Sequence, residues 1–135
     1  MKPNQWILCG GLLAALSVAA GAFGAHGLEG RLKAGGQLSE TEVNHRLDIH
    51  EKAARYQMYH SLALIAVGLM TWRAARPALA VAGWAFLAGT IVFSGCLYAI
   101  VLGGPLWLGA VVPIGGVAFL VGWIALAVSA WQTPG

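Results

Sequence analysis

Hydrophobic residues fall into four long runs that are separated by short or charged connections. The runs cover residues 6–25, 53–72, 77–102 and 106–131. Each run is close to or above the ~20 residues that a helix needs to cross ~30 Å of hydrocarbon. The runs are continuously apolar and lack the period-two alternation that is typical of β-barrel strands. The pattern therefore predicts a single all-α membrane domain, an up-and-down bundle of four transmembrane helices.

The second half of the chain lacks charge altogether. From Pro77 to Gly135 the sequence contains no Asp, Glu, Lys, Arg or His. A water-soluble domain needs polar side chains over its surface, and this segment has few to offer. The whole composition agrees, because 59% of the residues are hydrophobic and only 10% are charged. Membrane lipids are therefore the first partners that we expect.

The first run has a second interpretation. Lys2, the apolar stretch and the small residues 20–22 resemble a secretory signal peptide with its cleavage site. The stretch is longer than the about 7–15 residues of a typical signal core. We therefore favour a retained span.

A charged segment between the first two runs predicts an additional helix over residues 39–56. Ser39 and Glu42 begin it as a capping box. Three acid-to-base pairs at i,i+4 follow in the favourable order. They are Glu42–Arg46, Asp48–Lys52 and Glu51–Arg55. This amphipathic helix is expected either to lie on the membrane surface or to extend the second span.

Charge and motifs exclude several classes of function. The acids of the polar segment largely neutralise its bases, the net charge is only +3, and no basic face carries interleaved aromatic residues. We therefore expect no nucleic-acid partner. His45 and His50 are five residues apart and do not share a helix face, which argues against a metal site with Glu42. The sequence specifies no cofactor.

Four spans place both termini on the same side of the membrane. Arg73 and Arg76 lie in a very short loop beside Lys2, which favours a cytoplasmic position for that end. The longer connection over residues 27–52 carries more bases, so a raw count favours the opposite orientation. We expect the termini in the cytoplasm of a bacterium, with the spans in its plasma (inner) membrane. Interfacial tryptophans are expected at Trp6, Trp72 and Trp131 on one side and at Trp107 on the other.

Unusual polar residues gather at one end of this predicted bundle, away from the two arginines. Alternating directions bring residues 21–27, 55–60, 93–98 and 111–116 to the same level. The candidate site residues there are His26, Tyr56, Gln57, His60, Ser94, Tyr98 and Pro113.

His60 is the most informative of these residues. It lies ~18 Å along its helix from Trp72, which places an ionisable group inside the hydrocarbon, and such a group suggests a function. Pro113 is expected to interrupt the fourth span and to free the Gly109 carbonyl. Glycines 21, 24 and 27 are expected to admit a neighbouring backbone.

Several functions fit this set. The favoured interpretation is a polar packing cluster in a non-enzymatic structural, assembly or lipid-associated protein. The alternatives are a transporter or proton or ion pathway, and a quinone- or lipid-binding enzyme subunit. The spans contain no acid, and Ser94 has no Ser-His-acid constellation, so no catalytic residue is assigned. Small residues, including Gly83, Gly89, Gly95 and Gly122, allow close packing, which leaves a homo-oligomer or a membrane-complex partner open.

The same four segments carry a family resemblance. The stretches GAFGAHGL, RYQMYHSLAL, FSGCLY and VPIGGVAFLVGW occur in that order. They resemble the small bacterial inner-membrane family catalogued as domain of unknown function 423, whose eukaryotic relatives are called transmembrane protein 256. The resemblance implies a four-helix plasma-membrane protein, and it implies no substrate, cofactor or catalytic residue.

Overall fold

The computed structural model describes residues 1–131, and its regular elements over that range are all helical. In chain order they are the α-helix α1 (Pro3–Phe23), the π-helix η1 (Gly24–Leu28), α2 (Glu29–Ala34), α3 (Glu40–Arg73), α4 (Pro77–Val101), the 3-10 helix η2 (Leu106–Ala110) and α5 (Val112–Trp131). No strand occurs in this part of the chain, so the prediction of an all-α protein is confirmed.

Three helical segments among the described residues are long and apolar enough to cross a membrane. They are Pro3–Ala34, Pro77–Val101 and Leu106–Trp131. Helix α3 is not one of them, because Tyr56, Gln57 and His60 add polar groups to its otherwise apolar half. The count of four spans therefore stays a prediction.

Helix α3 is continuous over 34 residues, or about 51 Å. The polar segment 39–56 and the apolar segment 53–72 thus form one rod, and the polar helix extends the apolar one. The Ser39 hydroxyl caps the rod by accepting a hydrogen bond from the Glu42 amide at 3.2 Å. All three predicted i,i+4 ion pairs are formed on its surface.

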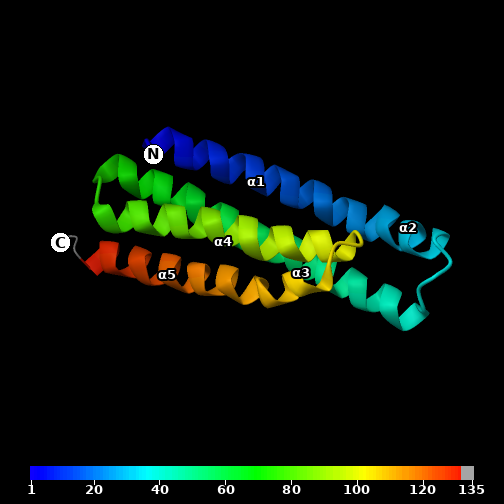
Figure 1. The fold of residues 1–135 in the computed structure, drawn as a ribbon. Coiled ribbons are helices and arrows are strands. Elements are labelled where there is room, and N and C mark those ends of the chain that lie inside the picture. Colours follow the sequence, from blue (N-terminus) through cyan, green and yellow to red (C-terminus); the bar gives the residue numbers. More distant parts are fainter. Residues whose placement is uncertain (132–135) are drawn as a thin grey trace.

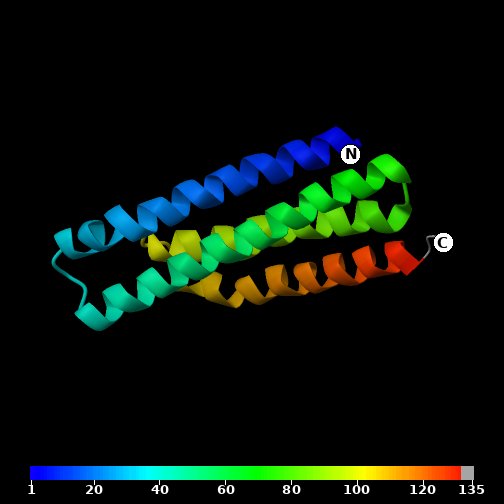
Figure 2. The ribbon, with the colours of Figure 1, turned by 180° about the vertical axis from the view of Figure 1, so that it is seen from behind.

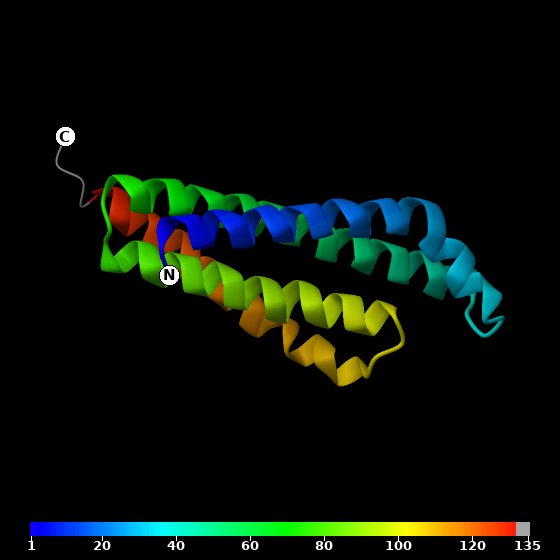
Figure 3. The ribbon, with the colours of Figure 1, turned by 90° about the horizontal axis from the view of Figure 1, so that it is seen from above.

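Helix α3 lies at the centre of the arrangement. It packs against α1 on one side and against α4 on the other, while α5 packs on α4. Helices α1 and α5 are therefore the two outer helices (Figures 1 and 2). The N-terminus and the end of α5 lie at one end of the molecule, and α2 with the start of α3 projects beyond the α4–α5 connection at the other (Figure 3).

Close helix packing depends on glycines at the crossing points. A Cβ atom on Gly10 of α1 would lie 2.6 Å from the Ser61 carbonyl oxygen of α3. A Cβ atom on Gly115 of α5 would lie 2.6 Å from the Phe93 backbone nitrogen of α4. By contrast, Gly21 faces open space and Gly24 makes room for a histidine ring, so the expected backbone approach at 21–27 is wrong.

Trp6 is not an interfacial residue, which corrects the prediction. Only 1% of its surface is exposed, and its indole packs over Gly83 and edge-on against Trp84 at 5.5 Å between ring centroids. Gly83 has no side chain, and the Trp6 ring fills the space that this leaves. Trp72, Trp107 and Trp131 are exposed, as an interfacial position requires.

Pro113 does not interrupt a long helix, which corrects a second expectation. The fourth run consists of η2 followed by α5, and Pro113 is the second residue of α5. A proline in the first turn of a helix removes an N–H that has no partner inside the helix anyway. The proline therefore marks where α5 begins, and it does not strain the span.

Candidate functional site

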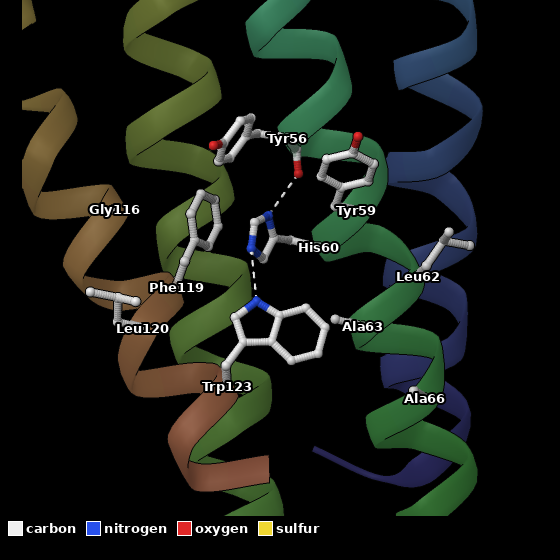
Figure 4. Close-up of a pocket in the computed structure, with 10 residues that line it drawn as sticks. All are labelled: Tyr56, Tyr59, His60, Leu62, Ala63, Ala66, Gly116, Phe119, Leu120 and Trp123. Atoms are coloured by element: carbon white, nitrogen blue, oxygen red, sulfur yellow. Dashed lines mark hydrogen bonds between the residues drawn. The ribbon is translucent and has the colours of Figure 1, made fainter. Parts of the chain in front are cut away.

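Both ring nitrogens of His60 take part in hydrogen bonds. The Nδ1 atom lies 2.7 Å from the backbone carbonyl oxygen of Tyr56, one turn earlier on α3. Because a carbonyl oxygen only accepts, Nδ1 carries the proton and donates it. The Nε2 atom then accepts from the indole Nε1–H of Trp123 on α5, over 3.3 Å (Figure 4). The imidazole is thus held neutral and in one tautomer between two helices.

Aromatic rings enclose this imidazole. Phe119 stacks on it face to face, with centroids 3.4 Å apart and planes 4° from parallel. Phe86 of α4 and the Trp123 ring lie 5.7 and 6.1 Å away, and Tyr56 is also 6.1 Å away. Only 4% of His60 is exposed. We call His60 with these four residues the His60 cluster.

The His60 cluster suits anchoring better than proton transfer or metal binding. A relay or a metal ligand needs an available nitrogen lone pair, and the Nε2 lone pair already faces the Trp123 N–H. If Nε2 were also protonated, its N–H would point at the N–H of Trp123 and would have no acceptor there. The described residues also contain no group of three or more His, Cys, Asp or Glu side chains that could hold a metal ion.

A groove of about 690 Å³ runs beside the His60 cluster, between α3 and α5 (Figure 4). Its lining comprises Tyr56, Tyr59, His60, Leu62, Ala63, Ala66, Gly116, Phe119, Leu120 and Trp123. Tyr59, Leu62 and Leu120 are each more than half exposed, so the groove opens at the side of the bundle. A bilayer would present lipid to that opening.

A second set of polar contacts joins α3 to α1 and α4. Ser17 of α1 and Ser94 of α4 donate to the consecutive carbonyls of residues 54 and 53, at 2.7 and 2.9 Å. Gln57 of α3 donates in turn to the Leu13 carbonyl of α1 at 2.8 Å. These bonds tie three helices together, as small polar side chains do between helices in membranes.

Tyr98 of α4 adds to this second set, toward the end of the bundle where α2 and the start of α3 form a projecting hairpin. Its ring lies 5.3 Å from the ring of His50, which also contacts Phe23 of α1 at 6.2 Å. The π-helical turn at Gly24 leaves space for this histidine, since a Cβ atom there would lie 2.7 Å from Nδ1 of His50. The Tyr98 hydroxyl is buried without a hydrogen-bond partner among the described residues.

The structure thus divides the candidate residues into two groups. Tyr56 and His60 lie among aromatic rings of α4 and α5. Gln57 and Ser94 form hydrogen bonds that join α3 to α1 and α4, and Tyr98 packs on His50. His26 and Pro113 are exposed and belong to neither group.

Sequence reasoning missed three participants, which are Ser17, His50 and Trp123. A hydroxyl within an apolar run was a usable signal for Ser17. Nothing in the sequence indicated that Trp123 would reach His60, because the two residues are distant in the chain and α5 is apolar around most of its circumference.

Known proteins match the chain over nearly its whole length. Residues 20–116 match the family described as "Protein of unknown function (DUF423)". The UPF0382 membrane protein of Staphylococcus aureus (strain bovine RF122 / ET3-1) is 42% identical over 96% of this chain and 98% of its own. Those of Staphylococcus epidermidis and Staphylococcus haemolyticus are 40% and 39% identical over the same shares. The chain belongs to this family. No solved structure matches it.

Membership in the DUF423 family confirms the resemblance seen in the sequence. The matched range contains all seven candidate residues, but it ends before Phe119 and Trp123. Relatives in the family are named membrane proteins, in agreement with the apolar helices of this one.

Proposed function

We propose that this DUF423-family protein is a non-enzymatic component of the bacterial plasma membrane that holds one amphiphilic lipid in the α3–α5 groove. The observation that carries the proposal is an apolar groove that opens sideways beside a histidine with both nitrogens engaged. Such a site can hold a hydrocarbon chain, and both ring nitrogens of its histidine are already hydrogen-bonded.

The proposal includes four spans, with α3 as the second. Helix α3 packs between α1 and α4, and both of these are apolar enough to cross the membrane. Lipid tolerates polar side chains that have hydrogen-bond partners inside the protein. Gln57, His60 and Ser61 all have such partners.

The groove has the size and lining of a lipid site. Its volume of about 690 Å³ lies within the range of ~300–1,000 Å³ that is usual for ligand pockets. The small residues Ala63, Ala66 and Gly116 leave room for a chain. Tyr59 is half exposed and lies next to Arg55 at the polar side of the groove, where a headgroup would sit.

The hydrogen bond between His60 and Trp123 gives the groove a fixed width. The backbones of α3 and α5 make few contacts with each other, because α5 packs mainly on α4 while α3 packs on α1 and α4. The two helices meet through side chains, as in the stack of Phe119 on His60. The bond at 3.3 Å is a bridge across the gap between them. We therefore assign His60 and Trp123 a positioning role.

Filling the groove tests the proposal. Gly116 lines the groove and a Cβ atom on it meets nothing within 4 Å, so Gly116→Leu can add a side chain at the groove wall. Native mass spectrometry of protein purified in a mild detergent should show one retained lipid for the wild type and none for Gly116→Leu.

The matched control is Gly11→Leu. Gly11 also faces open space, on the outer surface of α1, and it does not line the groove. This variant should retain the lipid. Equal retention by both variants, or no retained lipid in the wild type, would overturn the proposal.

A further inference from the structure

Charge is distributed very unevenly between the two ends of the bundle. All five acidic side chains lie between Glu29 and Glu51, at the end with the projecting hairpin. The opposite end carries Lys2, Arg73 and Arg76 with no Asp or Glu side chain. A positive potential is therefore concentrated at the end where the chain begins.

The two arginines line the same cavity. Helix α3 ends at Arg73 and α4 begins at Pro77, so both side chains flank the tight connection. A cavity of about 430 Å³ lies there, lined by Met70, Arg73, Ala74, Arg76, Leu79 and Ser129. It combines two guanidinium groups with an apolar floor.

Arg76 is held in place by α5. Its guanidinium donates to the Ser129 carbonyl at 2.6 Å, which fixes its position in the cavity wall. A guanidinium has five N–H donors in a planar fork that matches the oxygens of a phosphate. Arg73 is exposed and takes part in none of the ion pairs among the described residues.

Two exposed tryptophans beside this cavity indicate how deep it would lie in a bilayer. Trp72 directly precedes Arg73, and Trp131 follows Ser129 by two residues; they are 62% and 90% exposed. Exposed indoles at helix ends lie at the level of the lipid headgroups. The two guanidinium groups then lie at the level of the lipid phosphates.

We infer that this cavity binds the phosphate group of an anionic phospholipid. The guanidinium groups contact the phosphate oxygens, and the apolar floor formed by Met70 and Leu79 receives the first part of an acyl chain. A soluble phosphate would use the same donors, but it would gain nothing from that floor. The site is independent of the α3–α5 groove, which lies between other parts of the helices.

Lipid selectivity in bilayers tests the inference. The full chain is placed in phosphatidylcholine vesicles, and electron paramagnetic resonance compares the association of spin-labelled phosphatidylglycerol and phosphatidylcholine. A preference for phosphatidylglycerol is expected, and Arg73→Gln should lower it about fivefold. Arg31→Gln removes an exposed arginine at the other end and should leave the preference unchanged.

Further variants keep the result interpretable. Arg76→Lys retains the charge but loses the fork, and it should weaken the preference less than Arg76→Gln does. The preference should persist in Gly116→Leu, because that variant fills only the groove. The inference would be overturned if Gly116→Leu lost the preference for phosphatidylglycerol, or if Arg73→Gln kept it unchanged. It would also be overturned if inorganic phosphate abolished the preference at constant ionic strength.

Discussion

His60 is an ionisable side chain that is buried, and its two hydrogen bonds match the neutral form of the ring. The Tyr56 carbonyl fixes the proton on Nδ1, and the Trp123 indole occupies the lone pair of Nε2. Phe119 covers one face of the ring. In the four-span arrangement that we propose, this histidine lies within the membrane, where an ionisable residue suggests a function. We assign it the role of positioning α5 against α3.

The bond between Trp123 and His60 can be tested by removing its donor. Trp123→Phe leaves Nε2 of a buried imidazole without a partner, and it should lower the free energy of unfolding by about 1–2 kcal/mol. Equilibrium unfolding in mixed micelles measures the change.

Trp84→Phe is the matched control for this substitution. Trp84 is exposed to a similar degree as Trp123, but it donates no hydrogen bond among the described residues and contacts the Trp6 ring edge-on. Trp84→Phe should therefore lower the free energy of unfolding by clearly less than Trp123→Phe does. Equal losses in the two variants would show that the indole N–H contributes nothing.

Helix α3 organises the molecule at the scale of the elements. It carries His60 toward α5, and its backbone carbonyls accept hydrogen bonds from Ser17 of α1 and Ser94 of α4. Three helices therefore depend on α3 for their register. This explains why a helix with so many polar groups can occupy the centre of an apolar bundle.

Neighbouring glycines on α1 give a sharp test of how it packs on α3. Gly10→Ala places a Cβ atom 2.6 Å from the Ser61 carbonyl oxygen and 2.8 Å from the Ile65 side chain. We expect a loss of about 1–3 kcal/mol in the free energy of unfolding, because the helices must separate.

Gly11→Ala adds the same methyl group one position along, where nothing lies within 4 Å. It should be neutral or stabilising by up to about 1 kcal/mol, because alanine favours helix more than glycine does. A loss equal to that of Gly10→Ala would show that α1 does not contact α3 through this face.

The elements were more predictable than their contacts. The apolar runs and the Ser39 cap predicted the helices well, because both are local features. Trp6 and Pro113 were misjudged for reasons outside their own segments. Trp6 turns inward because Gly83, on another helix, leaves a space, and Pro113 is harmless because a 3-10 turn precedes it.

In the candidate site, too, the contacts between residues were less predictable than the helices that carry them. The sequence placed Tyr56, His60 and Ser94 at one level of the bundle, and their helices do meet there. It could not show that Tyr56 and His60 form a ring cluster with α5, while Ser94 bonds a backbone carbonyl of α3. That division follows from how the helices pack around α3, and an apolar helix circumference carries no signal for that packing.

At the scale of the whole molecule, charged side chains are distributed unevenly between the two ends of the long axis. The mixed-charge hairpin of α2 and α3 projects at one end, and the basic connection near Arg73 lies at the other. Bases in short loops favour the cytoplasm. We predict that green fluorescent protein fused to the C-terminus will fluoresce in a bacterial host, while alkaline phosphatase fused there will stay inactive. Active phosphatase and dark fluorescent protein would reverse the orientation and contradict cytoplasmic termini.

The central claim, that an amphiphile occupies the α3–α5 groove, is tested most directly by nuclear magnetic resonance in perdeuterated micelles. One equivalent of protonated phospholipid is added to the protein. Intermolecular Overhauser effects are then sought between its acyl chain and alanine methyl groups. We predict contacts to Ala66, which lines the groove and is partly exposed, and none to Ala82, which is buried in the core away from the groove. The contacts should vanish in Gly116→Leu. Their absence in the wild type, or their persistence in Gly116→Leu, would contradict the claim.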